Sequence, residues 1–462
     1  MRTTFGLTVF AIALVVIHHP LLTPAAFAQG PLTPPGAPGP TMKTLDQVEA
    51  RTIINATQTP GDGNNIFIIN SSGSYYLTGN VTGVSGKNGI LINATNVKVD
   101  LNGFQLIGVG GSLAGIWDGG NNRGNATVRN GTIRLWGGAG MDLGASFDSL
   151  IEELIVTDNG GVGMKMSDAC VLRDCMARNN TGDNIVTGFN ANLTHCTSVN
   201  SVTGYGINLQ GVATDCEARG NALYGIAAGN NSMVSHCAAH QNAGGGINVG
   251  TGSTIASCAA SGNGGGSGTG FGILAANGCT LTDSTASYNT VSYGIGTNPG
   301  STITHCTASF NTSAQASSGG IIPAGSPVIG CTAGGNTNPN ASPSHFTGTG
   351  IYVNGSNGTI KDCASSGNKG DGINVGSNCI LADNQCNNNG VDGIFASTSL
   401  NRIENNHVNF NGGAGIHSGG GDWIVRNTSS NNGGGNFVPA TGADIAPIQI
   451  ASTATNPFAN LQ

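Results

Sequence analysis

Acidic residues and histidines alternate at a regular spacing through the middle of the chain. Asp174, His195 and Asp215 follow one another after 21 and then 20 residues. Carboxylates and imidazoles transfer protons near neutral pH and bind divalent metals. If these residues face solvent in one row, opposite charges stack about 4.8 Å apart and stabilise neighbouring repeats. A metal- or substrate-binding row is the alternative. The row comprises Asp174, His195, Asp215, His236, Ser257, Asp283, His305, Gly330, Asp362, Asp383, Asn405 and Arg426.

Four candidate catalytic residues lie at the start of this row, namely Glu153, Arg173, Asp174 and His195. They come from adjacent repeats, and we expect them to converge on one lateral groove together with their charged neighbours. Carboxylates with an arginine or a histidine can supply general acid–base chemistry there, or a cation can bridge them to a uronate. The alternative is a solvated polar face near one end of the repeat region.

Charge is concentrated around these candidates. Residues 117–183 contain nine of the 23 acidic residues and six of the 16 basic residues, which distinguishes the first repeats from the later ones. Trp117 and Trp136 lie in the same segment, and their rings are expected to offer faces on which a sugar can stack. The sequence therefore places any enzymatic groove on the early repeats.

A cysteine follows many members of this row and marks the repeat itself. Cys175, Cys196 and Cys216 are separated by 21 and 20 residues. Repetition with this period is typical of a solenoid, which grows by stacking repeats without splitting its core. Later repeats are lengthened by insertions such as Gly262–Gly270 and Gly334–Gly348, which are expected to bulge as loops. The cysteine position continues as Cys237, Cys258, Ser284, Cys306, Cys331, Cys363, Asn384, Asn406 and Asn427.

Other residue types recur at fixed distances from the cysteine position. An apolar residue such as Leu172 precedes it by three positions and a small residue such as Ala218 follows it by two, and both are predicted to be core positions. A Gly-Ile pair comes about ten positions later, where Gly is expected to turn a corner and Ile to enter the core. Asn follows five positions after the cysteine in nearly every repeat, which predicts an asparagine ladder at a tight corner. These asparagines are Asn180, Asn221, Asn242, Asn263, Asn289, Asn311, Asn336, Asn368, Asn389, Asn411 and Asn432.

The twelve cysteines are expected to be buried, unpaired thiols. Side chains stacked on one face point in parallel directions, and Ser or Asn replaces Cys without disturbing the repeat. Scattered disulfides are the alternative in an exported chain. Because no C-x-x-C motif is present, redox or zinc-ribbon chemistry is not expected. No metal or other cofactor is predicted.

Short β-branched strands separated by Gly and Asn, with no segment long enough for a helix, predict an all-β parallel β-helix. The chain resembles right-handed parallel β-helix proteins of the pectate-lyase-like and nitrous-oxide-accessory type. Gly73–Asn80, Val97–Gly103 and the Cys/Asn repeats carry this resemblance across roughly residues 64–435. It implies a right-handed solenoid with coils of about 21 residues. The Asn-Thr-Asp, Gly-His-Gly and Arg-Ile-Lys signatures of polygalacturonases and the Asp-Pro-His-Asp signature of mannuronan epimerases are absent.

The two ends of the chain differ from the repeats in composition. Residues 1–28 combine a basic residue, an apolar run and an Ala-Phe-Ala cleavage site, which predicts a secretory signal peptide. Residues 29–60 are expected to form a Pro-rich linker and an N-terminal cap, 61–435 the parallel β-helix, and 436–462 a C-terminal cap. The mature protein is therefore predicted to be secreted, periplasmic or on the cell surface, with no membrane span after signal cleavage.

Composition restricts the partners. The formal net charge is −7 and no run of Lys or Arg occurs, which argues against a nucleic-acid-binding patch. Homogeneous repeats with few charged residues favour a non-catalytic module that binds a polysaccharide or cell-surface glycan, or that acts as a rigid surface spacer. A polysaccharide-active lyase, hydrolase or uronate epimerase is the alternative, so whether the chain is an enzyme stays open. A metal-handling role, which the accessory-type resemblance implies, rests on the Asp/His row alone.

Overall fold

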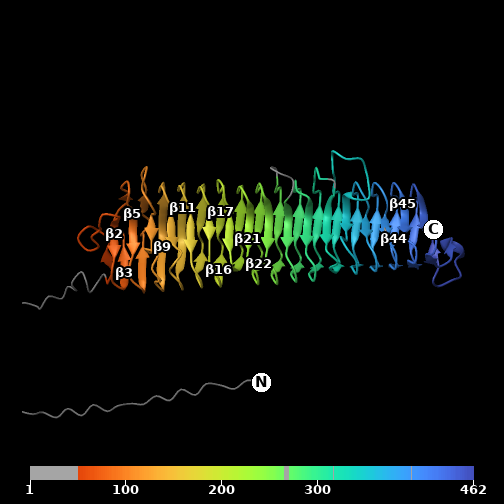
Figure 1. Cartoon of the computed structure of the whole chain (residues 1–462), viewed down its shortest axis with the longest axis horizontal. Coiled ribbons are helices and arrows are strands. Elements are labelled where there is room, and N and C mark those ends of the chain that lie inside the picture. The colour runs from red at the N-terminus through yellow and green to blue at the C-terminus, as the bar shows by residue number, and fades with distance from the viewer. Residues whose placement is uncertain (1–49, 265–269, 316, 397) are drawn as a thin grey trace, which may run out of the picture. The chain divides into compact units, whose positions relative to one another are not determined.

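The computed structural model describes residues 50–462 with the exception of residues 265–269, 316 and 397. Its regular structure consists of short β-strands and one 3-10 helix, η1 (Ala451–Thr453). The strands wind into a parallel β-solenoid of about 18 turns, seen from the side in Figure 1. The predicted all-β parallel solenoid is therefore confirmed. The predicted signal peptide and most of the Pro-rich linker lie outside the described residues.

Each regular coil contributes one strand to each of three stacks, and strands at equivalent positions pair in parallel. In one coil, β21 (Tyr224–Ala228) is followed by β22 (Met233–Ser235) and β23 (Ala238–His240), and β24 (Gly245–Val249) begins the next coil. We call the stack that contains β22 the first stack and the stack that contains β23 the second stack. The stack that contains β21 is the third stack. Among the early coils, β9 (Ala126–Arg134) and β11 (Leu150–Thr157) run through both the first and the second stack.

The first stack contains, besides β9, β11 and β22, the strands β1 (Thr52–Ile53), β3 (Gly73–Tyr76), β6 (Val97–Asp100), β13 (Val171–Arg173), β16 (Ala191–Thr194), β19 (Gly211–Thr214), β25 (Thr254–Ala256), β28 (Thr280–Thr282), β31 (Thr302–Thr304), β34 (Val328–Ile329), β37 (Thr359–Lys361), β40 (Ile380–Ala382), β43 (Arg402–Glu404), β46 (Trp423–Val425) and β49 (Asp444–Ile445). The second stack adds β4 (Val81–Thr82), β7 (Gln105–Ile107), β14 (Met176–Arg178), β17 (Thr197–Val199), β20 (Glu217–Arg219), β26 (Ala259–Ser261), β29 (Thr285–Ser287), β32 (Thr307–Ser309), β35 (Thr332–Gly334), β38 (Ala364–Ser366), β41 (Gln385–Asn387), β44 (His407–Asn409), β47 (Thr428–Ser430), β50 (Ile448–Gln449) and β51 (Asn460–Leu461). The third stack adds β2 (Asn65–Ile69), β5 (Asn88–Ile92), β8 (Ile116–Trp117), β10 (Met141–Leu143), β12 (Met164–Met166), β15 (Ile185–Val186), β18 (Ile207–Leu209), β27 (Phe271–Ala275), β30 (Tyr293–Thr297), β33 (Ser318–Pro323), β36 (Thr347–Tyr352), β39 (Ile373–Val375), β42 (Ile394–Ala396), β45 (Ala414–Ser418) and β48 (Gly435–Pro439).

The Asp/His row forms the corner between the first and second stacks, and we call it the corner row. Its members have left-handed backbone conformations, with φ of 54° at Asp174, 50° at His195 and 53° at Asp215. A single left-handed residue reverses the inward and outward alternation of a strand, so the following cysteine points inward. Asp and Asn tolerate this conformation better than most residues, which accounts for part of the row's composition.

The interior is filled by the positions that the repeat predicted. Leu172, Ala218 and the Ile of each Gly-Ile pair, such as Ile247, have no exposed surface. The asparagine ladder is also confirmed: from Asn221 to Asn432 the amide nitrogen of each member donates to the amide oxygen of the next at 2.8–3.0 Å. A buried amide without these partners would cost about 1–3 kcal/mol, so the ladder fixes the stacking of the coils.

The glycine of each Gly-Ile pair has a different role from the predicted one. No such glycine among the described residues has a left-handed φ, so the prediction that it turns the corner is wrong. A Cβ at Gly272 would lie 2.6 Å from the carbonyl oxygen of Gly294 and 2.7 Å from the amide nitrogen of Asn289. The asparagine ladder and the next coil thus leave no room for a side chain at this position, and only glycine fits.

All twelve cysteines are free and buried, which confirms the prediction of unpaired thiols. Their Sγ atoms contact backbone carbonyl oxygens, as for Cys216 and Thr214 at 3.3 Å. Burial raises the pKa of Cys170 to about 12 and raises the pKa of Cys386 as well. The thiols of Cys170 and Cys386 therefore stay protonated at neutral pH and behave as small core residues.

The C-terminal segment continues the ladders of the last coils. Asn427 donates from Nδ2 to Asn460 Oδ1 at 3.1 Å, and Leu461 pairs with Thr428. Residues near the C-terminus thus lie against the last coils, while the predicted domain boundaries themselves stay predictions. Across the described residues, no helix has the length and apolar character needed to cross a membrane.

Candidate functional sites

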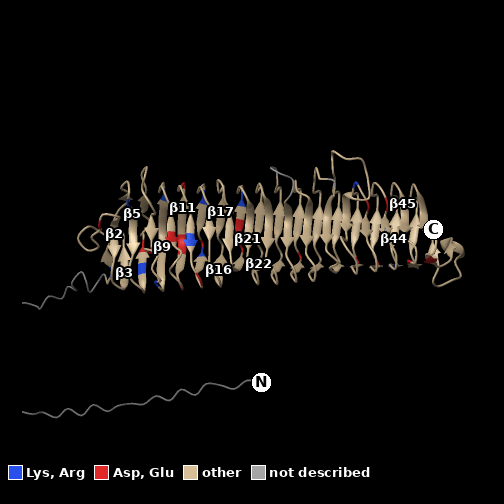
Figure 2. Ribbon diagram, in the orientation of Figure 1, with Lys and Arg blue, Asp and Glu red and all other residues tan. Residues whose placement is uncertain are grey.

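A ladder of ion pairs lies where the sequence predicted a groove, on the outward face of the first stack. Glu152 accepts a hydrogen bond from Arg173 Nε at 2.7 Å and lies 3.8 Å from Arg129 Nη1. Arg129 also contacts Asp100 at 3.0 Å. Figure 2 shows acidic and basic positions side by side at β11 and its neighbours. We call Asp100, Arg129, Glu152 and Arg173 the charge ladder; both of its carboxylates are neutralised by arginine.

The four predicted catalytic residues divide between this ladder and the corner row. Arg173 pairs with Glu152, whereas Glu153, Asp174 and His195 occupy left-handed corner positions. His195 Nδ1 lies 3.7 Å from Asp174 Oδ1, and the two side chains are 66% and 57% exposed. The structure thus brings Asp174 and His195 together, but it directs Arg173 toward the charge ladder. Their catalytic role stays a prediction, since exposed pairs of this kind also stabilise stacked coils.

Neither tryptophan that the sequence analysis assigned to sugar stacking lies beside these residues. Trp136 is 1% exposed and donates from Nε1 to the carbonyl oxygen of Leu106 at 3.2 Å, so the prediction is wrong for it. Leu135 before it is left-handed, with φ of 61°, and this turns the indole into the core. Trp117 lies on β8 of the third stack, whereas the charge ladder lies on the first.

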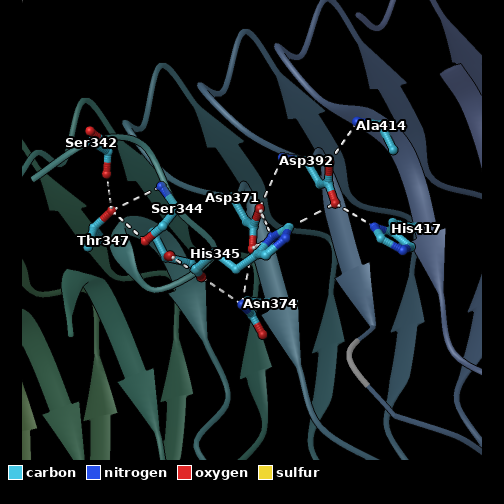
Figure 3. A network of polar contacts seen from close by, with 10 residues as sticks. Ser342, Ser344, His345, Thr347, Asp371, Asn374, Asp392, Ala414 and His417 are labelled. Carbon is cyan, nitrogen blue, oxygen red and sulfur yellow. Dashed lines mark hydrogen bonds and ion pairs between the residues drawn. The ribbon is translucent and has the colours of Figure 1, made fainter. Parts of the chain in front are cut away.

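A network of histidines and buried carboxylates that the sequence analysis did not single out lies on the third stack (Figure 3). Asp371 and Asp392 precede β39 and β42 by two residues each, and His417 belongs to β45. His345 lies in the loop before β36, inside the insertion that was predicted to bulge. Its Nδ1 lies 3.1 Å from Asp371 Oδ1 and 3.9 Å from Asp392 Oδ2, and His417 Nδ1 lies 3.0 Å from Asp392 Oδ2. We call these four residues the His/Asp network.

Hydrogen bonds from the surrounding backbone and side chains fix both carboxylates. Asp371 accepts from the backbone N–H of Asp392 at 3.0 Å and from Asn374 Nδ2 at 3.0 Å, and Asp392 accepts from the backbone N–H of Ala414 at 2.6 Å. Asn374 Nδ2 also donates to the carbonyl oxygen of His345 at 2.7 Å, which ties the loop to β39. The carboxylates are therefore held in place by groups other than the histidines.

The phenyl ring of Phe395, on the third stack, packs against the imidazoles of His345 and His417. Asn374, Phe395 and His417 occupy equivalent outward positions on β39, β42 and β45. The His345 ring stacks on Phe395 with centroids 3.8 Å apart and planes 9° apart, and His417 meets the same ring edge-on at 5.1 Å. The hydrogen bond to Asp371 raises the pKa of His345, while burial raises the pKa of Asp371.

A second site, which the sequence analysis also missed, is a pocket of about 500 Å³ at the C-terminal end of the first stack. Trp423 and Phe458 line it and are 45% and 57% exposed. The guanidinium groups of Arg402 and Arg426 lie 4.6 and 5.9 Å from these two rings, respectively. Glu404 accepts hydrogen bonds from both arginines, at 2.8 and 3.0 Å. We call this site the Trp423 pocket.

One periodic signal could have indicated part of the His/Asp network. Asp-Gly-Ile occurs twice, as Asp371-Gly372-Ile373 and as Asp392-Gly393-Ile394, at a position where earlier coils have Tyr205, Tyr224 or Tyr293. An acid beside a core strand is unusual, because burying a carboxylate is costly without a partner. His345 gave no such signal, since it lies in an insertion outside the register of the repeat.

The chain has the fold of a right-handed parallel β-helix, as the resemblance of its coils predicted. Residues 330–460 match the family model described as "Right handed beta helix region". No curated protein matches the sequence.

Several solved structures are similar to this chain. The A-module of the Azotobacter vinelandii mannuronan C-5 epimerase AlgE4 is 14% identical with a TM-score of 0.29, and the match covers 85% of this chain and 91% of the module. A tailspike protein mutant of E. coli bacteriophage HK620 in complex with a pentasaccharide is 12% identical with a TM-score of 0.44, over 70% of this chain and 69% of the tailspike. At these identities and TM-scores, no property of those proteins is carried over to this chain.

Proposed function

We propose that this protein is an exported β-helix module that binds a saccharide without cleaving it, and that the Trp423 pocket is the binding site. The observation that carries the proposal is the exposure of Trp423 and Phe458 in one pocket next to two arginines. Large aromatic side chains are usually buried in the absence of a partner, whereas binding sites combine apolar rings with a few well-placed polar groups.

The chemistry of the pocket suits a sugar ring. The C–H faces of a pyranose pack on aromatic rings, and its hydroxyl or carboxylate groups accept hydrogen bonds from guanidinium groups. Arg402 and Arg426 share Glu404 as a hydrogen-bond partner, so both cations are held in position before a ligand arrives. The pocket volume of about 500 Å³ lies in the range of small-molecule sites.

Glu404 is unsuited to acid–base catalysis in this pocket. The hydrogen bond from Arg402, supported by Arg426, lowers the pKa of Glu404. A general acid near neutral pH needs a raised pKa instead, so Glu404 remains an ionised anchor for the two arginines. This argues against Glu404 as a catalytic acid of the pocket.

A polysaccharide-active lyase, hydrolase or uronate epimerase on the early coils is the second candidate function. It is favoured by the position of His195, whose two ring nitrogens lie 3.7 Å from Asp174 and 3.8 Å from Asp215. An imidazole between two carboxylates is a plausible proton carrier. Prolonged incubation of the protein with the same saccharides, followed for new chain ends and unsaturated products, distinguishes this function from binding.

The binding test uses a panel of neutral and acidic oligosaccharides and isothermal titration of each into the purified protein. We expect at least one saccharide to bind, and Trp423→Ala to weaken its binding more than about 10-fold, a loss of roughly 1.4 kcal/mol. Met233→Ala is the matched control, because Met233 occupies the equivalent position of β22 and is 46% exposed. Absence of binding across the panel, equal binding by both variants, or release of cleaved products would each contradict the proposal.

A further inference from the structure

The His/Asp network contains the donor atoms of a metal site and is independent of the Trp423 pocket. We propose that His345, Asp371 and Asp392 bind one divalent transition-metal ion of the zinc class, with His417 fixing the carboxylate of Asp392 from outside the site. One donor atom from each of the first three residues lies within 4.8 Å of the other two. Imidazole nitrogen and carboxylate oxygen are the usual ligands of zinc besides thiolate.

The separations between donor atoms fit a small ion. Bonds of 2.0–2.1 Å in a tetrahedral site place neighbouring ligand atoms about 3.3 Å apart. The observed separations are 3.1 Å for His345 and Asp371 and 3.9 Å for His345 and Asp392. The first lies within about 0.2 Å of the tetrahedral spacing, and the second must shorten by about 0.6 Å.

The groups around the donors resemble those that orient metal ligands in proteins. Hydrogen bonds from the backbone and from Asn374 hold Asp371 and Asp392, and each carboxylate still contacts a histidine. Partners of this kind fix ligand orientation and raise metal affinity, and their loss typically weakens binding by about 10- to 100-fold. The site is therefore organised in the absence of the ion.

The charge balance of the network favours a cation. The side chains of Asp371 and Asp392 are 0% and 5% exposed, and within the described residues their ion pairs are all with histidines. Two adjacent buried carboxylates without a fixed positive charge are unfavourable, and histidines provide that charge only while protonated. A divalent ion supplies it independently of protonation.

Access from solvent is provided by the two histidines, whose side chains are 33% and 41% exposed. His345 comes from the loop before β36, while Asp371 and Asp392 come from the coils of β39 and β42, as Figure 3 shows. A bound ion would thus join an insertion loop to two successive coils. We expect it to stabilise the protein against unfolding, because it binds the folded state alone.

The test is equilibrium dialysis of the chelator-treated protein against Zn²⁺ and Co²⁺, with Mg²⁺ and Ca²⁺ as further arms. We expect one Zn²⁺ or Co²⁺ per chain, a Co²⁺ spectrum of tetrahedral type without a thiolate charge-transfer band, and a rise in Tm with Zn²⁺. In the double variant His345→Gln/His417→Gln, Zn²⁺ affinity should fall at least about 100-fold, and the rise in Tm should disappear.

The double variant His236→Gln/His305→Gln is the matched control, since it removes two exposed histidines of the corner row. It should bind one Zn²⁺ as the unchanged protein does. Melting curves in chelator verify that both double variants fold. Failure of the unchanged protein to take up one Zn²⁺ or Co²⁺, or loss of uptake in the corner-row control, would overturn the proposal. Saccharide binding at the Trp423 pocket should be the same with and without chelator, so the two proposals can fail separately.

Discussion

The charge ladder and the His/Asp network both contain carboxylates with little exposure, 10–12% in the ladder and 0–5% in the network, but they differ in their partners. In the ladder, carboxylates alternate with arginines whose side chains are about half exposed, such as Arg129 at 49% and Arg173 at 52%. In the network, two carboxylates lie next to each other with almost no exposure and only titratable histidines as ion-pair partners. The ladder is electrically complete and serves stacking, whereas the network lacks a fixed cation. The partner of a carboxylate, more than its presence, therefore indicates which region binds a ligand.

Among the changes that test this comparison, Asp371→Ala in the presence of chelator is expected to lower the free energy of unfolding most. The change removes the partner of His345, leaves the Asp392 N–H without its acceptor, and leaves Asn374 Nδ2 with the carbonyl oxygen of His345 alone. We expect a loss of about 3 kcal/mol of stability, measured as a shift in the urea midpoint. Glu152→Ala is the control in the ladder and should cost about 1 kcal/mol or less. Equal shifts for the two variants would remove the distinction between the regions.

A smaller effect is expected for Glu152→Arg, which places a third guanidinium between Arg129 and Arg173. Like charges directly opposite each other in neighbouring strands are destabilising, and we expect about 1–2 kcal/mol at low salt. High salt should restore most of this loss, because the guanidinium groups of Arg129 and Arg173 are about half exposed and therefore screened. Unfolding curves at low and high ionic strength measure the effect. A loss that does not depend on salt would show that the ladder acts through packing instead.

Glu404 gives a prediction for pH, since it has the same place in its coil as Glu152 and also lies between two arginines. Its pKa is lowered from the ordinary value of 4.5, chiefly by the hydrogen bond from Arg402. A lowered pKa in the folded state contributes stability that is present above pH 4.5 and is lost as the pH falls through the folded value. Tm measured below pH 4.5 should therefore fall less for Glu404→Gln than for the unchanged protein. Parallel pH profiles for the two proteins would contradict this.

The periodic part of the molecule could be predicted from the sequence. The cysteine position, the apolar position before it and the asparagine ladder all follow from side chains that repeat with the coil, and burial enforces each of them. Even the corner was implied, because the apolar residue three positions before an inward cysteine requires one break in the alternation. The left-handed φ of Asp174 and its equivalents is that break.

The non-periodic part could not be predicted in the same way. His345 reaches the network from an insertion, so its position depends on how the loop folds back and not on the repeat. Trp136 was misjudged because the left-handed Leu135 reverses its direction, and no repeat marks that residue. The Trp423 pocket depends in part on Phe458, which comes from the segment after the last regular coil. Each of these residues lies where the local structure departs from the repeating coil.

His195→Ala is expected to have the smallest effect on stability. It tests whether the corner row consists of stacking charges, like the ladder, or of functional groups, like the network. His195 lies 3.7 and 3.8 Å from two carboxylates, but all three side chains are about half exposed or more. Exposed pairs of this kind contribute at most about 0.5 kcal/mol each, so the urea midpoint should hardly change. Saccharide turnover, if the protein has any, is the second measurement on the same variant. A stability loss comparable to that of Asp371→Ala, or the disappearance of a turnover activity, would place His195 with functional groups and not with stacking charges.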